Sequence, residues 1–378
     1  MSELNYLEKL LDGTEVEWKA LGDVTSVLRG KRLTKNLLSA EEKFPVFHGG
    51  LEPLGYYNKS NRPANTVMII NVGASAGTVG YSTVDFWSSD GCFCLEHNEL
   101  LNNRFLYFAL IGYQSLLKSK VRVAGIPTLD AIVVNKLLIP IPCPENPEKS
   151  LAIQSEIVRI LDKFTALTAE LTAELNMRKK QYNYYRDQLL SFKEGEVEWK
   201  TLGEVAVIGT GNHDTQDAIE HGKYIFYARG REPLKLNVFD FDETAIITAG
   251  DGAGVEKVFH YAKGKYALHQ RAYRIVPNAF MNPRFVYHYI TAYFFTYIQK
   301  ASVSSSVTSL RRPMFLKFPI PVPPSEEQAR IVEILDKFDT LTNSITEGLP
   351  REIELRQKQY EYYRDLLFSF PKPETVSN

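Results

Sequence analysis

The feature that most constrains the fold of this 378-residue chain is an internal repeat. Residues 154–164 (QSEIVRILDKF) return as residues 328–338 (QARIVEILDKF), with 8 of 11 positions identical. Residues 181–192 (QYNYYRDQLLSF) return as residues 359–370 (QYEYYRDLLFSF), with 9 of 12 identical. The segments between the repeats have diverged far more. Two similar helical parts and two diverged globular parts predict pseudo-two-fold symmetry, which suits a target made of two unlike halves.

The repeated segments have the apolar spacing of long helices. From residue 153 to 175, apolar side chains recur at alternating steps of four and three, which is typical of a coiled-coil seam. The pattern predicts one helix over about residues 153–191 and a second over about 326–369. Proline-rich stretches, residues 139–144 and 318–324, precede the two helices and fix where they begin, because a helix interior excludes such stretches.

Each predicted helix has one narrow apolar seam and therefore needs a partner. We expect the two helices to pack on each other, and pseudo-symmetry makes that packing antiparallel. Gly348 and Pro350 interrupt the second seam, so we expect a kink or a new helix that begins at Pro350. The seam residues expected to act as the helix spacer are Leu167, Leu171, Leu175, Leu341, Ile345 and Leu349.

The two globular segments match each other weakly at a shift of 180 residues. Apolar runs ahead of glycine turns predict strands at 67–72 and 244–248, and residues 102–119 and 282–299 read as helices. The predicted fold class is α+β, with two similar globular domains joined by two long antiparallel coiled-coil helices in a circular, pseudo-two-fold organisation. The predicted divisions are a globular domain (1–150), a central helix (151–194), a second globular domain (195–324) and a distal helix (325–378).

Composition restricts the cellular setting. Three cysteines in 378 residues do not make a disulfide framework, so a reducing cytoplasm is expected. No apolar run approaches the roughly 20 residues that cross a bilayer. Cys92, Cys94 and His97 allow a zinc site as an alternative, but a tetrahedral site needs a fourth ligand, so buried strand cysteines are favoured.

The formal net charge of −1 is divided unevenly along the chain. Residues 24–140 carry +4, residues 204–322 carry +4, and the rest of the chain carries −9. Basic diverged parts agree with DNA contact, although composition alone also produces a split of this size. Because phosphate neutralisation dominates nucleic-acid affinity, +4 per domain predicts weak DNA binding by this chain without a basic partner.

The usual catalytic motifs do not occur in the sequence. Residues 73–77 (GASAG) precede Thr78 where a P-loop needs lysine, and neither GKS nor GKT occurs. Residues 250–254 (GDGAG) lack the spacing of a dinucleotide fingerprint. Pro323 and Pro324 lack the flanking residues of an amino-methyltransferase motif. We therefore expect a non-catalytic chain, with an unrecognised site among its seven histidines and many carboxylates as the alternative.

The repeated helices, each preceded by a Pro-Ile-Pro strand, resemble the specificity subunits of type I restriction–modification systems. Residues 168–175 (TAELTAEL) contain two tetrads that resemble the repeat whose copy number varies within the type IC subclass. The resemblance covers the whole chain. It is specific in the helices and loose in the globular domains.

The resemblance implies that the chain is a DNA-recognition subunit rather than an enzyme. Each globular domain would be a target recognition domain for one half of a bipartite, asymmetric double-stranded site. The helices would set the spacing and dock two modification subunits, which bring S-adenosylmethionine for adenine methylation. Restriction subunits would add translocation and cleavage driven by ATP and Mg²⁺. None of these cofactors would bind to this chain.

Base reading needs polar or basic side chains on loops that reach the major groove. The densest basic run, at residues 29–35, follows a predicted strand, and residues 311–312 follow the loop 302–309. The expected DNA-contacting residues are Arg29, Lys31, Arg32, Lys35, Arg122, Arg229, Arg231, Arg271, Arg311 and Arg312. Arg104 and Arg284 lie in matching predicted helices, so a structural role is expected for them.

The tetrads also have a physical interpretation as a ruler. One tetrad adds about 6 Å and about 40° of helix, against about 3.4 Å per base step. The alternative is neutral slippage in an exposed helix. For the whole chain, the competing functions are a coiled-coil adaptor with two non-DNA ligand-binding domains and a stand-alone enzyme of unknown type.

Overall fold

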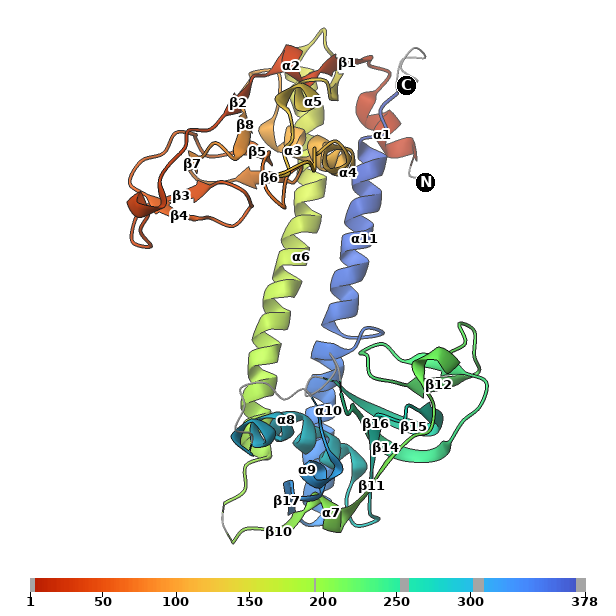
Figure 1. Ribbon diagram of the computed structural model, residues 1–378. Coiled ribbons are helices and arrows are strands. Elements are labelled where there is room, and N and C mark those ends of the chain that lie inside the picture. Colours follow the sequence, from red (N-terminus) through yellow and green to blue (C-terminus); the bar gives the residue numbers. More distant parts are fainter. Residues whose placement is uncertain (1–3, 194, 252–257, 302–308, 372–378) are drawn as a thin grey trace. The chain divides into compact units, whose positions relative to one another are not determined.

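The computed structural model describes residues 4–193, 195–251, 258–301 and 309–371 (Figure 1). The chain forms two compact units. Unit 1 contains residues 1–170 and 353–378, and unit 2 contains residues 171–352. Because unit 1 combines the beginning and the end of the chain, the organisation is circular, as the repeats predict. Among the described residues, no helix is both long and apolar enough to cross a membrane.

Three long helices correspond to the repeated segments: α6 (Pro147–Leu189), α10 (Ser325–Asn343) and α11 (Leu349–Leu367). Figure 1 shows α6 as one uninterrupted helix, as its apolar periodicity predicts. Within unit 1, the first half of α6 packs against α11, and within unit 2 the second half of α6 packs against α10. The paired segments run in opposite directions in each unit, which confirms the antiparallel pairing (Figure 1).

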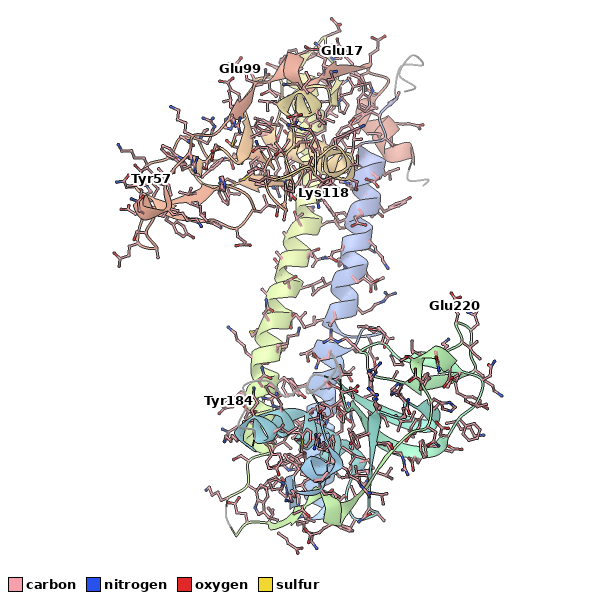
Figure 2. The ribbon with its side chains drawn as sticks, viewed as in Figure 1. Glu17, Tyr57, Glu99, Lys118, Tyr184 and Glu220 are labelled. Atoms are coloured by element: carbon pink, nitrogen blue, oxygen red, sulfur yellow. The ribbon has the colours of Figure 1, made fainter. Side chains whose placement is uncertain are left out.

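The two repeated motifs pack on each other. In unit 2, Tyr185 stacks on Phe338 of α10, with ring centroids 5.6 Å apart. In unit 1, Tyr363 of α11 stacks on Phe164 of α6 at 5.2 Å. These contacts explain why both motifs occur twice. The tyrosine that precedes Tyr185 is not part of this packing, because Tyr184 projects from α6 and is 62% exposed (Figure 2).

The distal helix is divided by residues 344–348, visible as the break between α10 and α11 in Figure 1. Pro350 cannot donate to a continuing helix, so α11 begins around it, as expected. Gly348 has φ +81° and lies against the carbonyl of Thr340, where a Cβ atom would clash. The seam predicted through Ile345 is wrong at that residue, which lies outside both helices and is 79% exposed.

A short antiparallel strand pair closes each globular part. β1 (Val16–Ala20) pairs with β9 (Leu138–Pro142) in unit 1, and β10 (Glu198–Thr201) pairs with β17 (Pro319–Val322) in unit 2. The segment VEWK occurs at residues 16–19 and again at residues 197–200. Each copy thus pairs with the Pro-Ile-Pro strand that leads into a long helix. The pairing brings the two ends of each globular part together.

The globular part of unit 2 contains one six-stranded sheet in the order β11-β16-β14-β15-β12-β13. Its strands are β11 (Ala206–Thr210), β12 (Tyr224–Tyr227), β13 (Leu234–Leu236), β14 (Phe241–Ala249), β15 (Phe259–Leu268) and β16 (Ala272–Pro277). The helical segments are α7 (Leu202–Val205), η2 (Thr215–Asp217), α8 (Pro283–Ala301) and α9 (Arg312–Leu316). All sheet neighbours are antiparallel except β12 and β15, which are parallel.

The globular part of unit 1 has the same topology in two smaller sheets, β2-β8-β5-β6 and β4-β3-β7. Its strands are β2 (Val27–Arg29), β3 (Phe44–Phe47), β4 (Gly55–Tyr57), β5 (Thr66–Ile70), β6 (Val79–Ser82), β7 (Trp87–Ser88) and β8 (Cys92–Leu95). The helical segments are α1 (Leu4–Leu11), α2 (Leu21–Val24), η1 (Lys35–Leu37), α3 (Asn103–Gly112), α4 (Gln114–Ser119) and α5 (Ala131–Asn135).

The pairings of the two sheets match strand by strand. β5 pairs with β6 and β8 as β14 pairs with β15 and β16, and β3 is parallel to β7 as β12 is parallel to β15. The single strand β15 of unit 2 thus corresponds to β6 and β7 together. The prediction of two versions of one α+β fold is confirmed, including the strands at 67–72 and 244–248, whose ends lie one to three residues from the observed ends.

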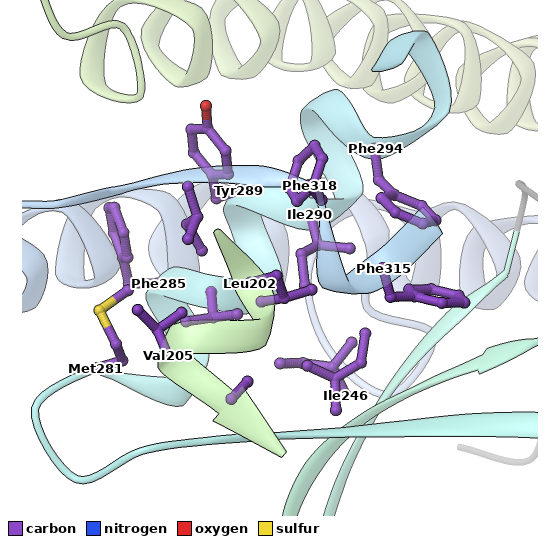
Figure 3. Close-up of a cluster of buried hydrophobic side chains, with 14 of the residues drawn as sticks. Leu202, Val205, Ile246, Met281, Phe285, Tyr289, Ile290, Phe294, Phe315 and Phe318 are labelled. Atoms are coloured by element: carbon purple, nitrogen blue, oxygen red, sulfur yellow. The ribbon is translucent and has the colours of Figure 1, made fainter. Parts of the chain in front are cut away.

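Each globular part has its own core. Figure 3 shows the core of unit 2, in which Phe285, Ile290 and Phe294 of α8 pack with Ile246 of β14. The corresponding cluster of unit 1 joins α3 to β5, β6 and β8. Burying these apolar faces stabilises each globular part by roughly 25 cal/mol per Å² removed from water.

The same two sets of side-chain contacts attach each globular part to a long helix. Gln154 of α6 accepts a hydrogen bond from the Asn102 backbone N–H at 2.8 Å, and Gln328 of α10 accepts one from Asn282 at 2.7 Å. Asn102 and Asn282 in turn accept hydrogen bonds from the first N–H groups of α3 and α8. The repeated glutamine therefore fixes the start of the helix that covers each sheet.

Arg104 and Arg284 form the second set of contacts, as expected from their matching positions. The Arg104 guanidinium donates to Asp162 of α6 at 2.8 Å. Arg284 donates to Asp336 at 2.6 Å and to Asp339 at 2.7 Å, both on α10. Each guanidinium also lies about 5 Å from the centroids of two tyrosine rings. The role of both arginines is structural.

Candidate nucleic-acid interface

The basic run of unit 1 surrounds a surface hollow of about 490 Å³. Arg29 ends β2, whereas Lys35 begins the short helix η1, and the loop between them contains Arg32. All three line the hollow together with His48 and Asp90. The structure therefore brings these three predicted residues together. Lys31 lies in the same loop and is exposed, with its backbone N–H bonded to Ser88.

A glycine makes this loop possible in each unit. Gly30 passes so close to the backbone of Ser88 and Ser89 that a Cβ atom would clash. Gly211 has the same approach to the Leu268 carbonyl in unit 2. The loops after β2 and β11 are therefore equivalent. The loop of unit 1 carries two basic side chains, Lys31 and Arg32, whereas that of unit 2 carries Asn212 and no Lys or Arg before its short helix η2.

Arg122 lies next to the hollow of unit 1 but does not line it. Its backbone pairs with Thr128, which also pairs with Val72 on the wall of the hollow. The Arg122 guanidinium donates to Asp130 at 2.9 Å and remains 67% exposed. A surface ion pair of this kind contributes little stability, roughly 0–1 kcal/mol, so the side chain can exchange Asp130 for a phosphate.

In unit 2, the structure brings Arg229 and Arg271 together on one carboxylate. Arg229 follows β12, and its Nη1 lies 3.2 Å from Asp251 Oδ1. Arg271 lies in the turn before β16, and its Nη1 lies 3.0 Å from Asp251 Oδ2. Burial raises the pKa of Asp251, but the hydrogen bonds from Arg271 and Arg229 outweigh burial and hold the pKa below its ordinary value.

The remaining predicted residues of unit 2 are exposed. Arg311 occupies the N-cap position of α9, and Arg312 begins that helix. The preceding Leu310 N–H donates to the Gly250 carbonyl, so these arginines follow a segment bonded to the end of β14. Arg231 lies in the loop between β12 and β13, beyond Arg229. Residues 302–308 of the predicted loop 302–309 lie outside the described part of the chain.

Four polar residues that lie beside these cations were not predicted from the sequence: His48 and Asp90 in unit 1, and Asp251 and His269 in unit 2. His48 Nδ1 lies 3.4 Å from Asp90 Oδ1. His269 is buried, and its Nδ1 accepts the Arg271 backbone N–H at 2.9 Å. Burial lowers the pKa of His269 below its ordinary value. No local motif marks these residues; only the equivalence of Gly30 and Gly211 could have pointed to the loops.

The equivalent positions of the two units carry unlike side chains. The Asn71 N–H donates to the Gly91 carbonyl, as the Gly250 N–H donates to the Arg271 carbonyl, so Gly91 stands where unit 2 has Arg271. Asp130 precedes α5 where Arg311 precedes α9. The two units therefore place their cations on different loops of one shared fold.

Within the described residues, no three His, Cys, Asp or Glu side chains come together as a metal site. Cys92 and Cys94 are buried in β8, as favoured from the sequence. The ring of His97 instead lies 2.9 Å from the Thr66 hydroxyl. Within each globular domain, the predicted cations therefore lie at the surface.

Comparisons with known proteins agree with this architecture. Residues 14–178 and 194–355 match the family model described as the type I restriction modification DNA specificity domain. The chain is 44% identical to the specificity subunit of the type I restriction enzyme EcoR124I/EcoR124II of Escherichia coli, with 100% of both chains covered. It is 37% identical to the EcoprrI specificity subunit of Escherichia coli, covering 92% of this chain and 93% of that subunit.

A solved structure has the same fold. The crystal structure of the S subunit of a type I restriction–modification system from M. genitalium superposes with a TM-score of 0.68 at 20% identity, covering 96% of this chain and 98% of that one. The chain belongs to the family of type I restriction–modification DNA specificity subunits.

Subunits of this family recognise DNA sequence and are not catalytic; they assemble with modification and restriction subunits. The chain is thus a DNA-recognition subunit, and the alternatives of a non-DNA adaptor and a stand-alone enzyme have no support.

Proposed function

We propose that each globular domain reads one half of a bipartite, asymmetric DNA site and that the helices set the unread spacing between the halves. The observation that carries this proposal is one fold built twice with unlike side chains at equivalent positions. Arg29 to Lys35 carry the cations of the first domain, whereas Arg229 and Arg271 carry those of the second. Different donors on one scaffold are what reading two different sequences requires.

The repeated helices provide the surface that we assign to two modification subunits. Tyr184 and Tyr362 occupy equivalent positions in the two repeats and are 62% and 52% exposed. Presenting one surface twice suits two molecules of one partner. S-adenosylmethionine would bind to those subunits, and ATP and Mg²⁺ to the restriction subunits, in the cytoplasm where the DNA lies.

The proposal is tested by combining the full chain with its modification subunits and mapping the methylated adenines by single-molecule sequencing. The expected result is methylation within a sequence of two unlike halves separated by bases that are not read. DNA binding should weaken steeply with salt, because released counterions supply much of the affinity. Methylation without a sequence preference would contradict the proposal.

The hollow of unit 1 predicts which half of the site a double variant affects. Lys31→Ala with Arg32→Ala removes two cations from the loop after β2 and should lower DNA affinity about tenfold or more at moderate salt. The bases read in the other half-site should be unchanged. Titrating wild-type and variant complexes with DNA altered in either half-site checks this, and unaltered affinity would refute the assignment.

A further inference from the structure

Three loops of the second domain meet at one carboxylate. Asp251 follows β14, Arg229 follows β12, and Arg271 lies in the turn between β15 and β16. Each oxygen of Asp251 binds one arginine, with distances of 3.2 Å and 3.0 Å. The Asp251 side chain is 24% exposed, and those of Arg229 and Arg271 are 38% and 63% exposed, so the cluster lies at the surface.

Hydrogen bonds outside the ion pairs fix the backbone around this cluster. The Gly250 N–H donates to the Arg271 carbonyl at 2.8 Å, and a side chain at Gly250 would clash with that carbonyl. Buried His269 accepts the Arg271 N–H at 2.9 Å. Asp251 pairs with Ser309 through an isolated bridge. The backbone positions of Asp251 and Arg271 are thus set by the fold rather than by the ion pairs.

Two adjacent guanidinium groups repel each other, and each side chain loses rotational freedom when it is held. Asp251 offsets both effects. Each arginine gives only its Nη1 to the carboxylate, and a guanidinium has five N–H donors, so both keep donors for another partner. Because the carboxylate would repel a phosphate, the cluster is better suited to the edge of a base than to the DNA backbone.

We infer that Asp251 is a specificity-determining positioning residue, which holds Arg229 and Arg271 as a two-armed reader of guanine in the half-site of the second domain. This inference rests on the proposed function. Arginine donates two hydrogen bonds to O6 and N7 of guanine in the major groove. The first domain lacks this device, because Gly91 stands at the position of Arg271 and Val72 at that of Asp251.

The test is to assemble full-length wild-type and Asp251→Asn chains with their modification subunits and methylate a library randomised in both half-sites. Asn keeps the shape but loses the charge that holds both arginines. The expected result is a loss of guanine preference on the order of 10- to 100-fold at one or two positions of one half-site. The preferences of the other half-site, in the same molecules, should be unchanged.

Arg271→Lys provides a second variant, because lysine keeps the charge but lacks the planar fork. It should relax guanine preference at a position that Asp251→Asn also relaxes, whereas the control Lys263→Ala, an exposed residue of β15 outside the cluster, should relax none. Unchanged base preference in both variants, or a loss of affinity equal for all sequences, would overturn the inference.

Failure of this inference can be told from failure of the proposed function. If the wild-type complex reads two half-sites and both variants read the same bases as wild type, only the role of Asp251 is wrong. If the wild-type complex reads no divided site, the proposed function is wrong. A lowered melting temperature of the full chain would reveal that Asp251→Asn unfolds. In that case, the base preference of Arg271→Lys alone decides whether the inference holds.

Discussion

At the scale of the residue, Arg284 joins the second globular domain to its helix. Its side chain is 22% exposed, and its guanidinium binds two aspartates of α10. Arg284→Ala should lower the free energy of unfolding by about 1–3 kcal/mol, because the aspartates are left without their partner. Urea unfolding of the full chain measures this. Arg330→Ala is the matched control, since its exposed pair with Glu327 on the same helix should contribute less than about 1 kcal/mol. Equal losses of unfolding free energy in the two variants would contradict the role of Arg284 in attaching the domain to its helix.

Asp336, which binds Arg284, predicts that the stability of the chain depends on pH. Burial raises its pKa, but hydrogen bonds from His288 and Arg284 outweigh burial and lower it below the ordinary value. Because the folded-state pKa lies below that of the unfolded chain, near 3.9, the stability from Asp336 is present above that value. It is lost as the pH falls through the folded-state pKa. The free energy of unfolding should therefore change less between about pH 6 and pH 3 in Asp336→Asn than in the wild type. Equal slopes of that free energy against pH would refute the prediction.

Single residues also show where sequence reasoning reaches its limit. Arg29, Arg32 and Lys35 were predicted to contact DNA because basic residues are dense in this part of the sequence. The structure places all three around one hollow, and their contact with DNA stays a prediction. Asp251 and Arg271 are 20 residues apart in sequence and meet only because β14 and β16 are neighbours in the sheet. No local pattern encodes that contact, which is why Asp251 was missed.

At the scale of the element, residues 344–348 depend on one glycine. Gly348 has a positive φ and faces the Thr340 carbonyl, so Gly348→Ala should lower the free energy of unfolding by about 2 kcal/mol or more. Gly195→Ala is the control, because Gly195 has a similar φ of +85° but no atom within 4 Å of the added Cβ. Urea unfolding of both variants isolates the clash with α10, and equal effects would show that the contact is unimportant.

Helix α6 is the element on which the spacing is proposed to depend. Deleting residues 172–175 removes about 6 Å and about 40° of helix, so the unread spacer should shorten by one or two base pairs of about 3.4 Å. Replacing the same four residues by alanine keeps the length and should keep the spacer. Mapped methylation sites measure both. An unchanged spacer in an active deletion variant would exclude the ruler.

The periodicity of the sequence predicted α6 well, because an uninterrupted seam has only one regular interpretation. It failed at Ile345, where apolar spacing continues although the helix does not. Pro350 and Gly348 decide that segment locally, and their effect outweighs the seam. The division of one strand into β6 and β7 in unit 1, but not in unit 2, could not be read from the sequence, since it depends on the packing of each sheet.

At the scale of the whole molecule, the chain contains the same globular fold twice, and each copy is attached to a long helix by equivalent residues. Gln154 and Gln328, Arg104 and Arg284 are retained in both units because they attach a globular domain to a helix. The loops that carry cations are not retained. This contrast separates the residues that maintain the fold from those proposed to read DNA.

The central claim is that each globular domain reads its own half of the site. It is tested most directly by mapping methylated adenines for three complexes: wild type, Lys31→Ala with Arg32→Ala, and Asp251→Asn. The first variant should alter recognition in one half-site only, and the second in the other half-site only. Changes that fall in the same half-site for both variants, or a wild-type site that is continuous, would contradict the claim.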